Sequence, residues 1–309
     1  MKTVDVIVVG GGPAGLTAAI YLSRYHLRTI VLDAGNSRAN LIPLSRNHAG
    51  YPDGIAGVDL VGRMRRQAEL YGSIIESATV TAIERTENGF EVVAGERYTA
   101  SAVLLATGVT NNCPQMAKAV HDEALQAGRL RYCPVCDGFE VTDKRVGVIG
   151  TGARGMKEAL FLRSYTAHVI LVAPDGAHEL SASERAELTA ANVQLVDTET
   201  LRFALKDALI EVDTGHDILA FDSIYPAMGS VIHSQLARSL GAQTEEIGCI
   251  VVDDHQRTDI AGLYAAGDVV LGLDQISHAM GEGGVAATTI RNDLAKRRSL
   301  NRTVAAIED

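Results

Sequence analysis

Residues 4–15, VDVIVVGGGPAG, decide the fold of this 309-residue chain. An apolar run rich in valine leads into a glycine turn, and small residues that suit a helix follow. In such a unit Gly10 allows the tight turn, Gly12 lets the backbone approach a diphosphate, and Gly15 lets the helix pack on the strand. The helix N-terminus then offers N–H groups and a positive dipole to the diphosphate. The stretch predicts a dinucleotide-binding βαβ unit.

The same pattern returns later in the chain. Strand-like residues 145–149 lead into GTGARG and then into an apolar helix that ends near residue 162. Each glycine run is followed by a second apolar strand, at 28–33 and at 168–173. Two βαβ units in one chain predict an α/β protein with two Rossmann-like dinucleotide-binding domains.

Three further segments bound these domains, because each reads as a buried strand that ends in a glycine turn. Residues 102–108 follow the first unit, and residues 224–229 follow the second. Residues 263–268, LYAAGD, form the third, and their natural place is back in the first domain. We therefore expect the second domain to be inserted into the first. The expected bounds are 1–112 and 242–309 for the first domain and 113–241 for the insertion.

A cysteine pair lies in the expected insertion. Cys133 and Cys136, in the stretch CPVCDGF, can form a strained, reducible disulfide, and nucleotide folds on either side suggest a source of electrons. A zinc site would need a second pair of ligands. Cys113 and Cys249 are isolated, with no His-x-x-His partner. We expect a redox pair and no metal site.

Bulk composition narrows the class of protein and its compartment. The net charge of −10 argues against nucleic acid or an anionic membrane as the main partner. No apolar run reaches the ~18 residues of a membrane span, and the N-terminus does not read as a signal peptide. Four cysteines, two of them in a redox pair, fit a reducing compartment. We expect a cytoplasmic protein.

Two carboxylates follow strands of the first domain. Asp33 ends the second strand, where a carboxylate accepts both hydroxyls of a ribose. Asp268 follows Gly267, at a turn where flavoproteins carry a carboxylate that accepts a hydrogen bond from the ribityl chain. A plain Asx turn is the alternative for Asp268. The helix that begins near Gln275 would stabilise negative charge on a reduced ring.

The glycine turn, the CPVCDGF stretch and residues 265–268 together resemble the low-molecular-weight thioredoxin reductases. Residues 47–55, NHAGYPDGI, are similar to that family's Asn-containing loop over the flavin. The resemblance covers nearly the whole chain in the same motif order. It implies FAD in the first domain, a homodimer, and a disulfide that passes electrons between the flavin and a thioredoxin-like protein or a small disulfide substrate.

The resemblance also implies residue roles. Cys136 would face the flavin, Cys133 would attack the substrate disulfide, and Asp137 would protonate a departing thiolate. A second interpretation makes Asp137 the N-cap of the helix after the pair, and both interpretations stay open. His48 and His278 are further candidates for proton transfer. The residues expected to hold FAD are Gly10, Gly12, Pro13, Ala14, Gly15, Asp33, Asn47, Val80, Thr107, Gly108, Gly267, Asp268, Gln275 and Ile276.

The chain departs from the family at the electron donor. The family reads the 2′-phosphate of NADPH with His-Arg-Arg-x-x-x-Arg, whereas the aligned residues 173–179 read APDGAHE. Pro174, Asp175 and Glu179 stand at the three arginine positions. Losing two charge-assisted bonds of roughly 1.5–3 kcal/mol each lowers NADPH affinity on the order of 10²–10⁴-fold. Ferredoxin, a second flavin or NADH is the donor we expect, and a second flavin or NAD(P)H is the candidate ligand of the insertion.

A second departure lies in the first domain. Residues 36–42, NSRANLI, replace the Gly-Gly-Gln-Leu that the family usually carries, so the edge of the flavin site is lined differently. We expect an FAD-dependent dithiol–disulfide oxidoreductase. The alternatives are a small-molecule dithiol oxidase of the gliotoxin-oxidase type and a redox-sensing flavoprotein that switches a binding surface without turnover.

Overall fold

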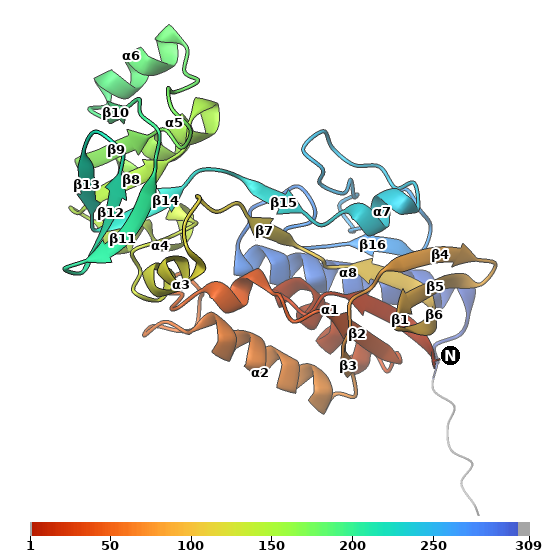
Figure 1. Ribbon diagram of the computed structural model, residues 1–309. Helices are drawn as coiled ribbons and strands as arrows, with labels where there is room; N and C mark the ends of the chain where they lie inside the picture. The colour runs from red at the N-terminus through yellow and green to blue at the C-terminus, as the bar shows by residue number, and fades with distance from the viewer. Residues whose placement is uncertain (1, 302–309) are drawn as a thin grey trace, which may run out of the picture. The chain divides into compact units, whose positions relative to one another are not determined.

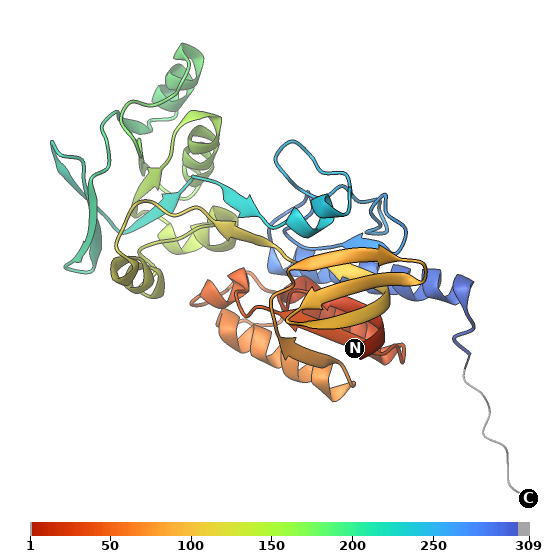
Figure 2. The ribbon, with the colours of Figure 1, turned by 45° about the vertical axis from the view of Figure 1, so that its right-hand side comes forward.

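A computed structural model describes residues 2–301 (Figures 1 and 2). Its residues group into two compact units. The first contains the residues up to Asn40, Val58–Val109 and the residues from Ile232 onward, and the second contains Leu41–Gly57 and Thr110–Val231. The chain therefore leaves the first unit twice and returns to it twice.

The first unit is built on a seven-stranded sheet in the order β3-β2-β1-β6-β5-β4, with β16 paired to β6. β3, β2, β1, β6 and β16 pair in parallel. The hairpin of β4 and β5 extends the sheet beyond β6 with antiparallel pairing. Because β16 comes after the second unit and still pairs with β6, the expected insertion is confirmed. The strands are β1 (Lys2–Val9), β2 (Thr29–Asp33), β3 (Ile74–Ser77), β4 (Ala82–Thr86), β5 (Gly89–Ala94), β6 (Glu96–Leu105) and β16 (Leu263–Ala265).

β1 shows why the quoted stretch forms a strand at the centre of this sheet. Ile7 and Val9 belong to the core on one face, and Val6 and Val8 belong to the core on the other. A strand buried on both faces reads as a continuous apolar run, which is the pattern in the sequence. In Figures 1 and 2 the long blue helix α8 runs along this sheet, and it packs with α1 in the second of these cores. The helices are α1 (Pro13–Arg24), the 3₁₀ turn η1 (Arg38–Leu41), α2 (Gly57–Leu70), α7 (Gln235–Ser239) and α8 (Ile276–Arg297).

The second unit contains a parallel four-stranded sheet, in the order β10-β9-β8-β14, and an antiparallel sheet of three strands. The parallel sheet repeats the β1–β2 register of the first unit, with Val148 opposite Leu171. Both sheets share a core that includes Ile149, Phe203 and Phe221. The strands are β8 (Arg145–Ile149), β9 (His168–Val172), β10 (Gln194–Val196), β11 (Arg202–Lys206), β12 (Leu209–Asp213), β13 (Ile218–Phe221) and β14 (Ser223–Pro226).

Short helices complete the second unit, and one of them carries the cysteine pair. Two of the four segments in which the chain passes between the units, β7 (Val109–Asn111) and β15 (Ser230–Ile232), pair as a two-stranded sheet. Within the described residues 2–301, no helix is both long and apolar enough to span a membrane. The helices of this unit are α3 (Lys118–Gln126), α4 (Pro134–Asp137), the 3₁₀ turn η2 (Gly138–Val141), α5 (Gly152–Leu162) and α6 (Ala182–Ala190).

The compact units differ from the expected domain bounds in three segments. Residues 110–112 group with the second unit and residues 232–241 with the first, each opposite to the expectation. Residues 41–57 group with the second unit, whereas the sequence placed them in the first domain. Ser45 and Ile55 exchange backbone hydrogen bonds that close this segment into a loop. Asn47 in the loop then donates to the Val135 carbonyl at 3.5 Å, so the loop contacts the helix of the cysteine pair. Contacts between segments far apart in the chain decide its grouping.

We expect Gly15→Ala to destabilise the first unit, because a Cβ at Gly15 would lie 2.0 Å from the Gly10 carbonyl oxygen. Overpacking of this kind lowers the free energy of unfolding by about 1–3 kcal/mol. Gly62→Ala in α2 is the matched control, since a Cβ there has nothing within 4 Å. It should stabilise by about 0.5–1 kcal/mol. Thermal unfolding midpoints that shift in the same direction for both variants would contradict the expectation.

Candidate active site

The first glycine turn follows β1 and has the geometry of a dinucleotide site. Gly10 has a φ of 107°, and a Cβ there would lie 2.3 Å from the Ala106 carbonyl oxygen. Gly12 is the N-cap of α1, and no side chain caps the first N–H groups of that helix. Pro13 presets the first helical turn, which contains no acidic residue. The helix end is thus built to receive an anion such as a diphosphate.

Asp33 is held at the end of β2 by backbone donors. Its Oδ1 accepts the N–H of Gly11 at 3.2 Å and that of Gly35 at 3.0 Å. Its Oδ2 accepts a bond from the Arg65 guanidinium at 3.2 Å. The carboxylate therefore lies against the glycine turn, where the sequence analysis expects a ribose.

Asp268, after β16, has a partner that the sequence analysis did not expect. The Arg38 guanidinium donates to Asp268 Oδ2 at 3.0 Å and to Asp274 Oδ2 at 3.0 Å. Burial raises the pKa of Asp268, Asp274 raises it further, and Arg38 opposes both. Arg38 lies in the stretch that replaces the family's Gly-Gly-Gln-Leu, and that departure was the available signal.

Glu282 is a further carboxylate beside the Asp268 turn of the first unit, and sequence reasoning missed it. Its Oε2 accepts the N–H of Gly267 at 2.7 Å, and its Oε1 lies 3.0 Å from His278 Nε2, one turn earlier in α8. Burial raises the pKa of Glu282. His278 therefore has a carboxylate partner in its own helix. Through Glu282 it is linked to Gly267, in the turn that carries Asp268.

The other expected FAD contacts in the first unit lie on neighbouring elements. The carboxyl ends of β2, β1, β6 and β16 carry Asp33, the glycine turn, Thr107 with Gly108, and Asp268. Thr107 Oγ1 donates to the His233 carbonyl at 2.6 Å. Gln275 is the N-cap of α8, Ile276 begins that helix, and Val80 packs on the core. Asn47 is the exception, because it groups with the second unit.

The cysteine pair of the second unit is a disulfide, as predicted. Cys133 is the N-cap of α4, and its Sγ accepts the backbone N–H of Cys136 at 3.2 Å. A backbone donor aimed at a sulfur stabilises the thiolate form after reduction. The outward, substrate-attacking role of Cys133 stays a prediction.

Asp137 follows the disulfide directly and is paired on both oxygens. The Arg131 guanidinium donates to Oδ2 at 2.8 Å, and the Tyr225 hydroxyl donates to Oδ1 at 2.9 Å. Burial raises the pKa of Asp137, and Arg131 opposes that shift. Asp137 occupies the N-cap position of η2, but its side chain forms no capping hydrogen bond, so the N-cap interpretation is wrong for its side chain.

Two half-buried acids, Glu140 and Glu158, lie in this part of the second unit, and sequence reasoning missed both. Burial raises the pKa of Glu158, in α5, to about 7, although Arg154 opposes the shift. Glu158 Oε1 and Glu140 Oε2 are buried without a hydrogen-bond partner among the described residues. The Arg46 guanidinium lies 3.9 Å from Glu140 Oε1.

The second glycine turn differs from the first because the chain folds back over it. Thr151, the N-cap of α5, accepts the backbone N–H of Glu179 on its Oγ1 at 2.7 Å. A Cβ on Gly152 would lie 3.6 Å from the Glu179 carbonyl oxygen. His178 is buried, and its Nε2 lies 3.1 Å from the Leu171 carbonyl. The loop after β9 is therefore tied to the turn and to its own strand.

An arginine that contacts this loop is already engaged in hydrogen bonds. Arg185, in α6, forms two bonds to Asp197, at 2.9 and 2.8 Å, and a third to the His178 carbonyl at 3.3 Å. Asp197 also accepts the backbone N–H of His178 at 2.9 Å. With no lysine or arginine in residues 173–179, these residues do not fit the 2′-phosphate of NADPH.

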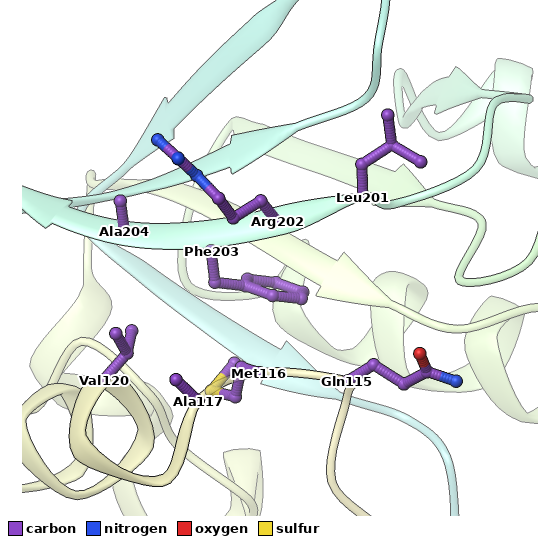
Figure 3. A pocket seen from close by; sticks show the side chains of 8 residues that line it. All are labelled: Gln115, Met116, Ala117, Val120, Leu201, Arg202, Phe203 and Ala204. Atoms are coloured by element: carbon purple, nitrogen blue, oxygen red, sulfur yellow. The ribbon is translucent and has the colours of Figure 1, made fainter.

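An open pocket of about 670 Å³ lies elsewhere in the second unit (Figure 3). Phe203 points from β11 toward the loop that carries Met116. None of the expected site residues lines this pocket. Among the residues that the structure describes, no group of three or more His, Cys, Asp or Glu side chains is placed to hold a metal ion.

Known proteins share this organisation. The family described as pyridine nucleotide-disulphide oxidoreductase matches residues 4–283. A thioredoxin reductase of Treponema pallidum is 34% identical over 301 residues, covering 92% of this chain and 94% of that protein.

Solved structures agree with this assignment. The thioredoxin reductase of Streptococcus pyogenes MGAS5005 superposes with a TM-score of 0.88 at 26% identity, covering 96% of this chain and 99% of that one. The structure of HlmI gives a TM-score of 0.86 at 27% identity, covering 95% and 93%. The chain belongs to the pyridine nucleotide-disulphide oxidoreductase family, as a thioredoxin reductase-like, flavin-dependent disulfide oxidoreductase.

Proposed function

We propose that electrons pass in this enzyme between FAD held by the first unit and the Cys133–Cys136 disulfide of the second. The disulfide at the start of α4 carries this proposal, because it is the one redox group that the described chain itself supplies. The substrate is a disulfide in a thioredoxin-like protein or a small molecule. A homodimer and a cytoplasmic location remain predictions.

The first unit fits FAD. The uncapped start of α1 would take the diphosphate, and Asp33 would take the ribose. Asp268 would accept a hydrogen bond from the ribityl chain. Arg38 bonds to one oxygen of Asp268 and also to Asp274. FAD, when bound, supplies a carrier of two electrons. The remaining proposed contacts are Asn47, Val80, Thr107, Gly108, Gln275 and Ile276.

The protein's own residues account for the exchange with substrate. After reduction, the Cys133 thiolate attacks one sulfur of a substrate disulfide and forms a mixed disulfide, and the other substrate sulfur leaves as a thiolate. Asp137 moves the proton that this leaving group takes up. The Cys136 thiol then loses its proton and attacks Cys133, which restores the internal disulfide and releases the second substrate thiol.

We propose a donor other than NADPH, namely ferredoxin, a second flavin or NADH. The loop after β9 supports this, since Pro174, Asp175 and Glu179 provide no guanidinium and Arg185 is held by Asp197. The same loss favours a second function, a small-molecule dithiol oxidase in which the same exchange runs in reverse. Turnover with any disulfide or dithiol would exclude a pure redox sensor.

The purified protein should carry one tightly bound FAD per chain. Gly12→Asp places a carboxylate at the start of α1, where it would repel the diphosphate and compete for the N–H groups, and should abolish FAD binding. Thr151→Asp at the N-cap of α5 is the matched control and should keep the FAD content unchanged. Flavin absorbance per chain measures both. A colourless wild-type protein that takes up no FAD contradicts the proposal.

Cys136→Ser should abolish electron transfer from flavin to the disulfide, because no disulfide can form. Cys133→Ser should leave the Cys136 thiolate beside the flavin, which a long-wavelength absorption band would report. Cys113→Ser is the control, since Cys113 lies outside the disulfide and should leave activity unchanged. Full disulfide reductase activity in both Cys133→Ser and Cys136→Ser would remove this pair from the active site.

NADPH should reduce the flavin poorly. The double variant Asp175→Arg with Glu179→Arg should improve NADPH use more than NADH use, because only NADPH carries the 2′-phosphate. Restoring two charge-assisted bonds predicts a gain on the order of 10²–10⁴ in affinity. Glu187→Arg on α6 makes the same kind of charge change as a control. Rapid, saturable reduction of the unmodified protein by micromolar NADPH in stopped-flow absorbance would refute the prediction.

A further inference from the structure

Asp137 is placed by two residues from different parts of the second unit. Arg131, in the segment before α4, donates to Oδ2 at 2.8 Å, and Tyr225, in β14, donates to Oδ1 at 2.9 Å. The Arg131 side chain is 17% exposed, and Tyr225 is wholly buried. Both oxygens of the carboxylate next to Cys136 are therefore held inside the protein.

Each partner is fixed independently of Asp137. Arg131 Nε donates to the Gly128 carbonyl at 3.0 Å and lies 3.3 Å from Ser223 Oγ. Tyr225 belongs to the parallel sheet, where it pairs with Val148 of β8. The Arg131 guanidinium and the strand that carries Tyr225 are therefore held by contacts other than Asp137. They can orient its carboxylate and act on its charge.

Charges on the elements around Asp137 act in opposite directions. Burial raises its pKa, and Glu140 in η2 raises it further. Glu158 in α5 adds a second nearby carboxyl, which itself interacts with Asp137. Arg131 and the Tyr225 hydroxyl oppose these effects. An arginine beside an aspartate lowers the carboxyl pKa by about 1–3 units, so Arg131 counteracts the effect of burial on Asp137.

We propose that Arg131 and Tyr225 are positioning residues that orient the Asp137 carboxyl for proton exchange with the Cys133–Cys136 dithiol, with Arg131 balancing its charge. This rests on the proposed function. When a dithiol closes to a disulfide, two electrons leave with two protons, and a carboxylate can accept one of them. When a substrate thiolate leaves, the same group returns that proton. Without its guanidinium partner, the Asp137 carboxylate would place an unbalanced negative charge beside the dithiol, which would disfavour a thiolate there.

The test measures the pH dependence of thiol reactivity in the reduced, FAD-loaded protein. The rate of alkylation of Cys133 by iodoacetamide reports the thiolate directly and needs no turnover. Arg131→Gln should raise the midpoint of this pH profile by about 1–2 units, because the charge that balances Asp137 is lost. Tyr225→Phe should shift it in the same direction by a smaller amount. Arg131→Lys should restore part of the shift, since it keeps the charge without the planar fork.

Arg129→Gln is the matched control. Arg129 carries the same charge two residues away but donates to the Asp222 carbonyl rather than to Asp137, so its profile should follow the wild type. In an Asp137→Asn background, the effect of Arg131→Gln should fall to less than half, as expected for a residue that acts through Asp137. Thermal unfolding midpoints confirm that each variant is folded.

Two failures remain distinguishable. If the wild type turns over no disulfide or dithiol, the proposed function fails, while the alkylation profiles still decide the positioning role. If Arg131→Gln and Tyr225→Phe both keep the wild-type midpoint, the positioning role is wrong whatever the turnover. An Arg131→Gln shift of equal size with and without Asp137 would also overturn it, because Arg131 would then act on the thiol directly.

Discussion

The close approach of three backbone segments at Ala14 is the constraint on which the first unit depends. A Cβ on Gly267 would lie 2.8 Å from Ala14 Cβ, and a Cβ on Gly283 would lie 2.3 Å from the Ala14 carbonyl oxygen. Gly15 meets the Gly10 carbonyl in the same way. The start of α1, the turn after β16 and the helix α8 can meet only because these positions lack side chains. The same packing brings Asp268 to the dinucleotide turn.

The parts of the fold that the sequence predicted share one physical property. β1 and β8 are buried strands beside a glycine turn, so their apolar runs and turn residues identify them without any distant partner. The loop at residues 41–57 could not be assigned in this way, because its partners in the second unit lie far away in the chain, as Val135 lies 88 positions from Asn47. The site divides similarly. The disulfide follows from spacing, whereas Tyr225 lies 88 positions from Asp137 and Arg38 lies 230 from Asp268. Pairings at such separations leave no period in the sequence.

The two glycine turns show how one backbone geometry serves different ends. The N-cap of α1 is a glycine with no side chain, so nothing of the chain itself occupies the helix end. The N-cap of α5 is Thr151, whose hydroxyl accepts the N–H of Glu179 and ties the following loop to the turn. In the sequence the two turns look alike, because both contain the glycines of the motif. The contact of that loop with Thr151 is a difference between the two turns that only the structure shows.

The electrostatics of the two units follow one rule. Asp268 and Asp137 are both buried enough that burial raises their pKa, and an arginine opposes that shift in each case. The arginine comes from another segment, Arg38 for the first acid and Arg131 for the second. A buried charge without a partner is neutralised by a pKa shift, whereas a paired one keeps its charge. Redox chemistry moves protons together with electrons, so an acid beside a thiol pair is useful only if its charge can change at the pH of the cell. In the proposed mechanism the Arg131 guanidinium sets that balance, and the Tyr225 hydroxyl, 88 positions from Asp137, holds the other carboxylate oxygen.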